Sequence, residues 1–169
     1  MIVVLFGLLG CGKNYVGKIF NQEFGFHLYD ADQDLTPAMK NAIANHQVFT
    51  HQMRDEYFDI VINRIAGLNK KHTHLVIAQA LFKNKHRRKI LRAFPDAKFL
   101  WVQCAPELIS DRLTARANHI AGKSYGELVN RHFEIPTIPY EVLMNNEGRE
   151  EVRQQIKNVL KRNLKGDVL

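Results

Sequence analysis

Residues 2–13 read Ile-Val-Val-Leu-Phe-Gly-Leu-Leu-Gly-Cys-Gly-Lys, an apolar run that ends in the spacing Gly7-x-x-x-x-Gly12-Lys13. The β-branched run predicts a buried strand, and the apolar spacing after Lys13 predicts a helix to about Phe24. A glycine-rich turn between strand and helix can aim several backbone N–H groups at one anion, because no Cβ blocks the approach. The stretch therefore predicts a loop that binds the phosphates of a nucleoside triphosphate.

The residues of this loop are expected to contact different parts of the nucleotide. Lys13 adds a full positive charge near the β and γ phosphates, and the following helix adds the positive end of its dipole. The hydroxyl residue that the motif places after the lysine is replaced by Asn14, whose amide oxygen can also ligate Mg²⁺. The residues expected to contact the nucleotide here are Gly7, Leu8, Leu9, Gly10, Cys11, Gly12, Lys13, Asn14 and Tyr15.

Length and composition favour a single domain over residues 1–169. The chain is 46% hydrophobic and 24% charged, which suits one well-buried domain and leaves too little for two. No apolar stretch approaches the roughly 20 residues of a membrane helix, and no basic region precedes the first apolar run. We therefore expect a cytoplasmic protein that makes no membrane contact and exists as a monomer or homodimer.

The formal charge of +7 suits a polyanionic ligand without choosing between ATP, a sugar acid and nucleic acid. Much of this excess lies in segment 83–92, whose apolar positions have helical spacing. We interpret its basic residues as a solvated helix face.

Short apolar runs alternate with helical stretches along the chain, which predicts a parallel sheet covered on both faces. Strands are expected at 2–6, 26–29, 75–78, 98–103 and 141–144. Helices are expected at 16–24, 37–44, 50–68, 85–93, 106–116, 124–133 and 149–162. Ligands of such sheets bind beyond the carboxyl ends of the strands.

Two aspartates follow the second predicted strand. Alternation along an extended chain would aim Asp30 and Asp32 to the same side. Phosphoryl transfer to a hydroxyl needs a carboxylate that orients the acceptor and carboxylates that hold Mg²⁺ directly or through water. We predict that both act in catalysis, that Asp32 also contacts the acceptor, and that Asp32 and Asn14 hold the metal. Which aspartate is the base stays open, and Asp34 can simply begin the next helix.

Arginines at two places can bind anions. Arg112 and Arg116 are one helical turn apart, so both guanidinium groups can close over the phosphates, although a solvated helix face is the alternative. Arg54 can hold a carboxylate of the acceptor, with Lys40 nearby, whereas intrahelical pairing with Glu56 is the other interpretation.

A series of motifs in one order resembles the gluconate kinases, within the shikimate-kinase-like branch of P-loop small-molecule kinases: Gly7–Lys13, Asp30-x-Asp32, Arg54, Gln79-Ala80-Leu81 and Arg112-x-x-x-Arg116-x-x-His119. The likeness covers roughly residues 2–160. It implies an α/β, three-layer P-loop NTPase fold of the nucleoside-monophosphate-kinase type, with a five-stranded parallel sheet in the order 2-3-1-4-5. It also implies a helical substrate-binding insert at about 35–70 and a helical lid at about 112–136.

The resemblance implies ATP and Mg²⁺ as cosubstrates and phosphoryl transfer to a hydroxyl of a small polar metabolite, most simply a sugar acid such as gluconate. It implies catalytic roles for Lys13 and Arg116. It also implies that Arg112, Asn145 and Asn146 contact the nucleotide. The acceptor is assigned to Asp32, Lys40, Arg54, Gln79, Lys83 and His119. One departure is that gluconate kinases carry Ser-Ala-Leu-Lys after the third strand, where this chain has Gln79-Ala80-Leu81-Phe82.

Two other functions stay open. A polynucleotide or nucleoside kinase could use the same loop and bind phosphates through segment 83–92. Alternatively, Asn14 and the altered acceptor motif suit a nucleotide-binding regulatory protein without turnover.

Overall fold

The predicted phosphate-binding loop and the two aspartates follow strands of one sheet. In this computed structural model, which describes residues 1–115 and 123–165, five parallel strands lie in the order β2-β3-β1-β4-β5. Their bounds are β1 Ile2–Phe6, β2 His27–Asp30, β3 Leu75–Ala78, β4 Lys98–Gln103 and β5 Glu141–Met144. The order confirms the predicted topology, and only the second strand is displaced, by one residue.

The central strand β1 shows why the sheet is covered on both faces. Val4 pairs with Ile77 of β3 and with Phe99 of β4, and β1 is buried along its whole length. Alternate side chains of β1 enter different cores. A parallel strand at the centre of a sheet needs this continuous apolar run, which is the pattern that the sequence shows.

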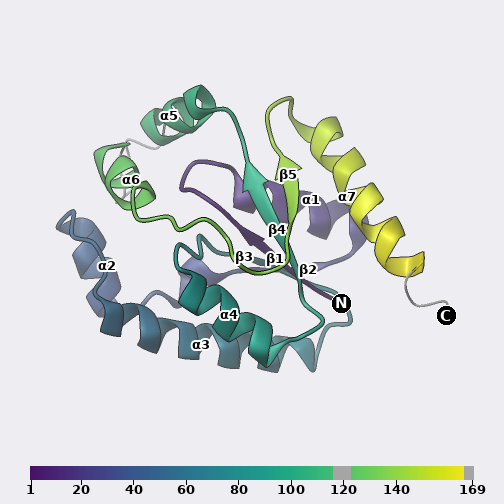
Figure 1. Cartoon of the computed structure of the whole chain (residues 1–169), viewed down its shortest axis with the longest axis horizontal. Helices are drawn as coiled ribbons and strands as arrows, with labels where there is room; N and C mark the ends of the chain where they lie inside the picture. Colours follow the sequence, from purple (N-terminus) through teal and green to yellow (C-terminus); the bar gives the residue numbers. More distant parts are fainter. Residues whose placement is uncertain (116–122, 166–169) are drawn as a thin grey trace.

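Helices cover both faces of the sheet (Figure 1). The helices are α1 Lys13–Phe24, α2 Pro37–Ala44, α3 His51–Asn69, α4 Asn84–Ala93, α5 Pro106–Ala115, α6 Lys123–Asn130 and α7 Arg149–Lys165. Helices α3 and α4 lie on one face of the sheet, and α1 and α7 lie on the other. Helices α2 and α6 lie at the end of the molecule where β1 leads into its loop. None of these described helices has the length and apolarity needed to cross a membrane.

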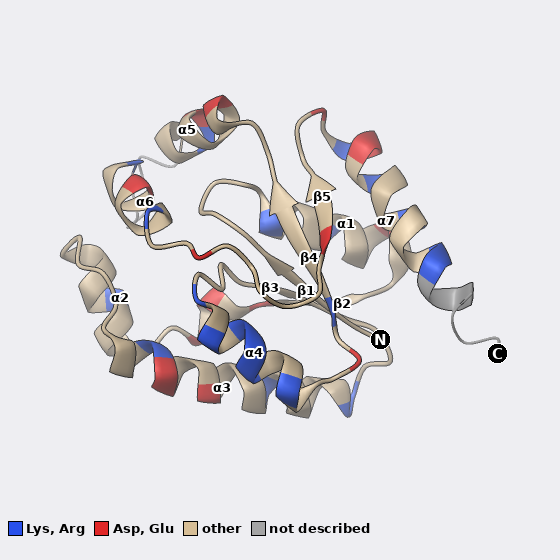
Figure 2. Ribbon diagram, viewed as in Figure 1, with Lys and Arg blue, Asp and Glu red and all other residues tan. Residues whose placement is uncertain are grey.

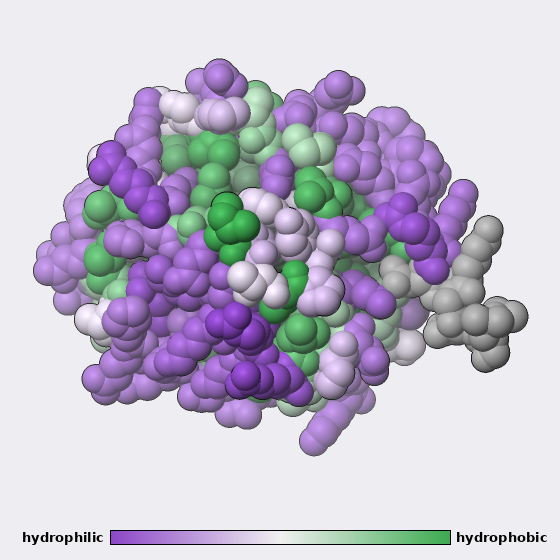
Figure 3. Space-filling view, viewed as in Figure 1, coloured by the Kyte–Doolittle hydropathy of each residue, from purple (hydrophilic) through white to green (hydrophobic). Residues whose placement is uncertain are grey.

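The predicted helix 124–133 is too long, because α6 ends at Asn130. After a turn in which the Phe133 amide bonds the Asn130 carbonyl, the chain runs back to the end of β3, where the Glu134 amide donates to the Phe82 carbonyl at 2.9 Å. This return segment, residues 131–140, carries the exposed apolar side chain of Ile135. Apolar side chains gather over it in the middle of Figure 3, whereas the surface over α3 and α4 is largely hydrophilic.

The interpretation of segment 83–92 as a solvated face is wrong for Arg87, which is fully buried. Its guanidinium carbon lies 5.0 Å from the ring centroid of Phe6 and 4.6 Å from that of Phe133. It donates to the Asn84 side chain at 2.9 Å and to the Glu134 carbonyl at 2.7 Å. Burial lowers the Arg87 pKa to about 10. Arg87 thereby fastens the return segment to the sheet.

Two lysines of α4 are paired with acids on α3, and Figure 2 shows basic and acidic residues mixed on these two helices. Lys85 pairs with Asp55 at 2.6 Å and Lys89 pairs with Asp59 at 2.7 Å. The Lys85 ammonium and the His86 ring hold the pKa of the Asp55 carboxyl at about 2. These pairs therefore match part of the positive charge of this segment, whereas Arg88 and Arg92 are exposed and form no ion pair among the described residues.

Candidate active site

The loop between β1 and α1 has the backbone that its glycines predict. Gly7, Gly10 and Gly12 all have positive φ, at 147°, 89° and 91°. A Cβ at Gly7 would collide with the Val102 carbonyl, and one at Gly12 would collide with the Asn145 side chain. Left-handed backbone and close packing together require glycine at these two positions. The loop is therefore a compact cradle at the start of α1, where the first turn of the helix has backbone N–H groups without intrahelical partners.

Lys13 lies folded over this loop. Its ammonium donates to the carbonyls of Gly7 at 3.1 Å and of Leu8 at 2.8 Å. Tyr15, two residues further along α1, is exposed. The Lys13 charge is thus held within the cradle by weak neutral acceptors, from which a phosphate can draw it.

The end of β5 and helix α5 meet the loop from the side of β4. Asn145 is buried, and its side-chain amide donates to the Cys11 carbonyl at 2.9 Å. Arg112 donates to the same carbonyl at 3.3 Å and to the Asn145 carbonyl at 3.1 Å. The buried Asn145 Oδ1 has no hydrogen-bond partner among the described residues. Asn146 is exposed, and its side chain accepts from the Ala105 amide.

One further residue, Asn130, holds the loop, and no motif in the sequence predicts it. Asn130, at the end of α6, accepts from the Leu9 amide at 2.8 Å and donates to the Leu9 carbonyl at 3.2 Å. A single asparagine in a surface helix has no motif around it, so only the fold reveals this contact. Arg116 and His119, which the sequence assigns to the lid, lie outside the described residues.

Asn14 and the two aspartates gather beside Lys13, although not by strand alternation as expected. Asp30 ends β2, and Asp32 lies in a 3-10 helix, Ala31–Asp34, that starts with a hydrogen bond from the Asp32 amide to the Asp30 carboxylate. The Asn14 amide donates to that carboxylate at 2.6 Å. Asn14, Asp30 and Asp32 line one cavity of about 390 Å³ together with Gly12 and Lys13.

Asp34 does not begin the next helix, as the sequence allowed. It ends the 3-10 helix, accepts from the Tyr29 hydroxyl at 2.8 Å and forms two hydrogen bonds with Arg64 of α3. The Arg64 guanidinium lowers the pKa of the Asp34 carboxyl. Asp34 therefore ties the aspartate segment to α3.

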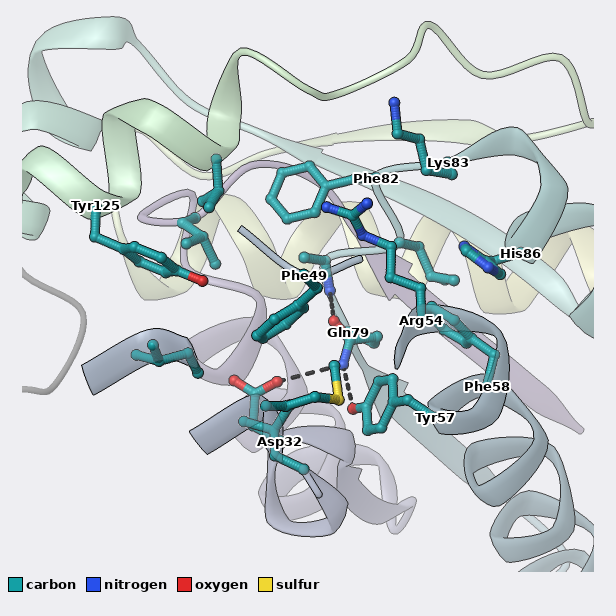
Figure 4. A pocket seen from close by; sticks show the side chains of 17 residues that line it. Asp32, Phe49, Arg54, Tyr57, Phe58, Gln79, Phe82, Lys83, His86 and Tyr125 are labelled. Atoms are coloured by element: carbon teal, nitrogen blue, oxygen red, sulfur yellow. Dashed lines mark hydrogen bonds between the residues drawn. The ribbon is translucent and has the colours of Figure 1, made fainter. Parts of the chain in front are cut away.

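A larger cavity of about 780 Å³ adjoins the first and shares four lining residues with it, Leu9, Asp32, Gln79 and Ala80. It lies between the end of β3 and helices α2, α3 and α6 (Figure 4). Arg54, Lys83 and Tyr125 line it too. Lys40, which the sequence also assigned to the acceptor, is exposed on α2 and does not line either cavity.

Gln79 joins Asp32 to the core. Its side-chain amide donates to the Asp32 carboxylate at 3.3 Å and to the Tyr57 hydroxyl at 2.5 Å, while its oxygen accepts from the Ala80 amide. Tyr57 donates in turn to the Ala31 carbonyl at 2.7 Å, and burial raises the pKa of its hydroxyl far above the usual value. These bonds fix the Asp32 carboxylate at the boundary between the two cavities (Figure 4).

Arg54 projects from α3 into the larger cavity (Figure 4). The predicted alternative, an intrahelical pair, is absent among the described residues, because Glu56 accepts from Gln52 and Asp55 binds Lys85 and His86. Burial lowers the pKa of Arg54, yet a guanidinium keeps its charge in proteins. Arg54 is therefore a half-buried cation that forms no ion pair with an acid among the described residues, which suits an anionic ligand.

Comparison with known proteins identifies the family of this chain. The model of the shikimate kinase family matches residues 9–161. The chain belongs to the shikimate kinase family. The predicted resemblance to this branch is thereby confirmed, and the protein is a small-molecule kinase that transfers a phosphoryl group to a small metabolite. Its P-loop kinase fold is of a kind that uses ATP.

Solved structures agree with this kinase fold. A sugar kinase from Janibacter sp. HTCC2649 has a TM-score of 0.81 at 18% identity, covering 95% of this chain and 94% of that one. A gluconokinase from Sinorhizobium meliloti 1021 has a TM-score of 0.78 at 17% identity, covering 99% and 97%. Shikimate kinase from Acinetobacter baumannii, in complex with shikimate, has a TM-score of 0.66 at 14% identity, covering 99% and 95%. No curated protein sequence matches the chain.

Proposed function

We propose that this kinase transfers the γ-phosphoryl group of ATP to a hydroxyl of a small hydroxy acid. The observation that carries the proposal is the position of Asp32, which lines both the cavity at the phosphate-binding loop and the larger cavity beside it. A hydroxyl bound in the larger cavity can meet Asp32 and the loop at once. Proximity of this kind is the main contribution an enzyme makes to phosphoryl transfer.

The chemistry at Asp32 follows from this position. The acceptor hydroxyl gives its proton to the Asp32 carboxylate while its oxygen bonds to the γ-phosphorus. The bond between that phosphorus and the oxygen that bridges it to the β-phosphate breaks, and the electron pair leaves with ADP. Gln79 and Tyr57 hold the carboxylate in place through these steps.

The nucleotide is held by the loop and by two cations. Lys13 exchanges the Gly7 and Leu8 carbonyls for phosphate oxygens, which are stronger acceptors. Arg112 already lies against the loop and offers the remaining donors of its guanidinium to the developing negative charge.

Mg²⁺ fits the oxygen atoms beside Lys13. Asn14, Asp30 and Asp32 offer amide and carboxylate oxygens, which are the ligands that Mg²⁺ prefers. No group of three acidic, histidine or cysteine side chains in residues 1–115 and 123–165 is arranged to hold a metal without help. These residues would share the ion with the phosphates, and the ion would neutralise charge on the transferred group.

Arg54 supports an acid as the acceptor. It lies in the larger cavity as a half-buried cation, and a planar guanidinium binds a carboxylate through two parallel hydrogen bonds. Sugar acids such as gluconate belong to this class, and gluconate is the acceptor that the sequence predicts. Lys83 is paired with Glu134 at 3.1 Å, so Arg54 is the better placed of the two cations.

A coupled assay of ADP release tests the proposal. The purified kinase is given ATP and Mg²⁺ with gluconate, other hydroxy acids, neutral sugars, nucleosides and oligonucleotides in turn. We expect acids to stimulate ADP release and their amides or alcohols not to do so. Absence of stimulation by every acid, with ATP still bound in calorimetry, would instead support a nucleotide-binding protein without turnover.

A polynucleotide kinase is the weaker candidate. It would need the cations of segment 83–92 to face a phosphate backbone, yet Arg87 is buried and Lys85 and Lys89 are paired with acids of α3. Exposed pairs of this kind leave little field for steering a polyanion. Oligonucleotide phosphorylation with strong salt dependence would reverse this ranking.

A further inference from the structure

We propose that the acceptor of this kinase is a hydroxy acid with an apolar, ring-like body that carries few hydroxyls besides the one that reacts. The inference rests on the proposed function, since it narrows the acceptor bound in the larger cavity. It distinguishes the acceptor from a fully hydroxylated sugar acid, which needs a hydrogen-bond partner for each hydroxyl.

The walls of the larger cavity are mostly apolar. Three aromatic side chains from different elements line it: Phe49 before α3, Phe58 within α3 and Phe82 after β3. Further apolar side chains come from the loop, α2 and α6, namely Leu9, Leu35, Met39, Ile43 and Val129. Apolar and aromatic walls of this kind favour a ligand whose body is itself apolar, because both surfaces leave water together.

Most polar groups of this cavity already have partners. Both amide atoms of Gln79 and the hydroxyl of Tyr57 belong to the network that holds Asp32. His86 is hydrogen-bonded to Asp55 at 2.9 Å and stacks on Phe58. Lys83 is paired with Glu134. These groups therefore have little capacity left for additional hydroxyls of an acceptor.

Two groups remain available on the described walls of the cavity besides Asp32. The Arg54 guanidinium and the Tyr125 hydroxyl have no hydrogen bond to another described residue, and both point into the cavity (Figure 4). A cation, a phenol and one catalytic carboxylate suit an acid with a reacting hydroxyl. A polyol chain would leave its other hydroxyls buried without partners, which opposes binding.

The placement of the charges indicates the shape of the acceptor. In Figure 4 the Asp32 carboxylate and the Arg54 guanidinium lie on different sides of the cavity, with Phe49 between them in this view. An acceptor that spans them presents its hydroxyl to Asp32 and its carboxylate to Arg54. The apolar body between these two ends would pack against the aromatic walls.

A series of acids that differ in their hydroxyls tests the inference. The acceptors are 3-hydroxycyclohexanecarboxylate, 3-(hydroxymethyl)benzoate, shikimate, quinate and gluconate, each assayed with the full chain, ATP and Mg²⁺ for kcat/KM. We expect the first two to exceed gluconate by about 100-fold, because each extra hydroxyl loses water without gaining a partner. Equal or higher kcat/KM for gluconate or quinate would overturn the inference while leaving the proposed function intact.

A pair of variants locates the preference in the cavity. Phe49→Asn places a hydrogen-bonding group on the apolar wall, and we expect it to reduce the ratio of kcat/KM between 3-hydroxycyclohexanecarboxylate and gluconate by about tenfold. Val48→Asn makes the same kind of change at the exposed neighbouring residue, which does not line the cavity, and leaves the ratio unchanged. Equal ratios in the two variants would contradict the assignment of this wall.

Binding measurements separate the two levels of the proposal. Calorimetric titration of each acid into the kinase measures affinity without turnover. Tighter binding of the apolar hydroxy acids with no phosphorylation of any acid supports the inference about the cavity and refutes the proposed function. Binding that strengthens with added hydroxyls refutes the inference whatever the turnover.

Discussion

The side-chain amide of Asn145 donates a hydrogen bond to the carbonyl of Cys11 at 2.9 Å and so joins the end of β5 to the phosphate-binding loop. The same Asn145 side chain occupies the space where a Cβ at Gly12 would lie. The loop is therefore shaped from outside by a residue far along the chain as well as by its own glycines. A nucleotide therefore meets a loop in which the Cys11 carbonyl is already hydrogen-bonded to Asn145.

Replacing Asn145 should weaken nucleotide binding. In Asn145→Ala the Cys11 carbonyl loses a buried hydrogen bond, which costs about 1–2 kcal/mol and corresponds to roughly tenfold weaker affinity for a non-hydrolysable ATP analogue. Titration calorimetry measures this directly. Asn158→Ala is the matched control, since it removes an exposed asparagine of α7 to which no role in nucleotide binding is assigned. Equal affinities in both variants would show that the loop does not need Asn145.

Removing the charges at the reacting phosphate should reduce turnover much more than stability. We expect Lys13→Ala and Asp32→Ala each to lower kcat at least about 100-fold, because the first removes charge from the phosphates and the second removes the group that orients the acceptor. Arg116→Ala should act in the same way. Lys18→Ala, an exposed lysine on the same helix as Lys13, is the control. Unchanged steady-state rates in the purified variants would end the assignment of these residues.

The network behind Asp32 makes a separate prediction about coupling. Gln79→Leu and Tyr57→Phe should each lower kcat about tenfold while the KM for ATP stays constant, because both loosen Asp32 without touching the nucleotide. The kcat of the double variant should be little lower than that of either single variant, because either substitution alone already breaks the hydrogen-bond network that holds Asp32. Fully additive losses would mean that the two residues act independently.

Arg87 should matter for stability and not for chemistry. Arg87→Met removes three hydrogen bonds of the core, and the Glu134 carbonyl loses its donor, so we expect the free energy of unfolding to fall by about 3 kcal/mol. Urea denaturation measures the change. Arg88→Met at the exposed neighbour should cost less than about 0.5 kcal/mol. A small loss at Arg87 would indicate that its aromatic and carbonyl contacts contribute little.

These cases show which parts could be predicted from the sequence. The strands and the loop could be, because a buried parallel strand is a continuous apolar run and the glycine spacing is local. Arg87 could not be told from Arg88, since its partners Phe6 and Phe133 are remote in sequence and meet it only when the sheet forms. Asn130 was missed for the same reason.

The aspartate segment could be predicted only in part. The sequence placed Asp30 and Asp32 at the correct end of the sheet, but the predicted strand alternation gave way to a 3-10 turn. The Asp30 side chain itself stabilises that turn by accepting from the Asp32 amide. Aspartate side chains often form such local hydrogen bonds with the backbone in place of extended structure. The predicted location of the two aspartates was therefore correct, but the predicted extended conformation was wrong.

Two histidines with lowered pKa values, His27 and His86, should make stability depend on pH. His27, in β2, stacks on His72 with ring centroids 3.8 Å apart and planes within 7° of each other. Burial, and then the charge of His72, lower the pKa of His27. Burial likewise lowers the pKa of His86, despite its bond to Asp55. Protons therefore bind the unfolded chain more readily than the folded one at these sites.

The sign of the pH effect follows from linkage. Because the folded pKa of His27 lies below the unfolded value of about 6.5, its contribution to stability is complete above that value and is lost as the pH falls through the folded pKa. The free energy of unfolding, measured in urea, should thus decrease between pH 7.5 and 5.5. His27→Gln should flatten this decrease, since the amide cannot take up the proton that destabilises the folded state. Thr73→Ala changes an uncharged residue of the same surface hollow and should keep the wild-type slope. If the free energy of unfolding of His27→Gln falls with pH as steeply as that of the wild type, protonation of His27 does not cause the loss of stability at acidic pH.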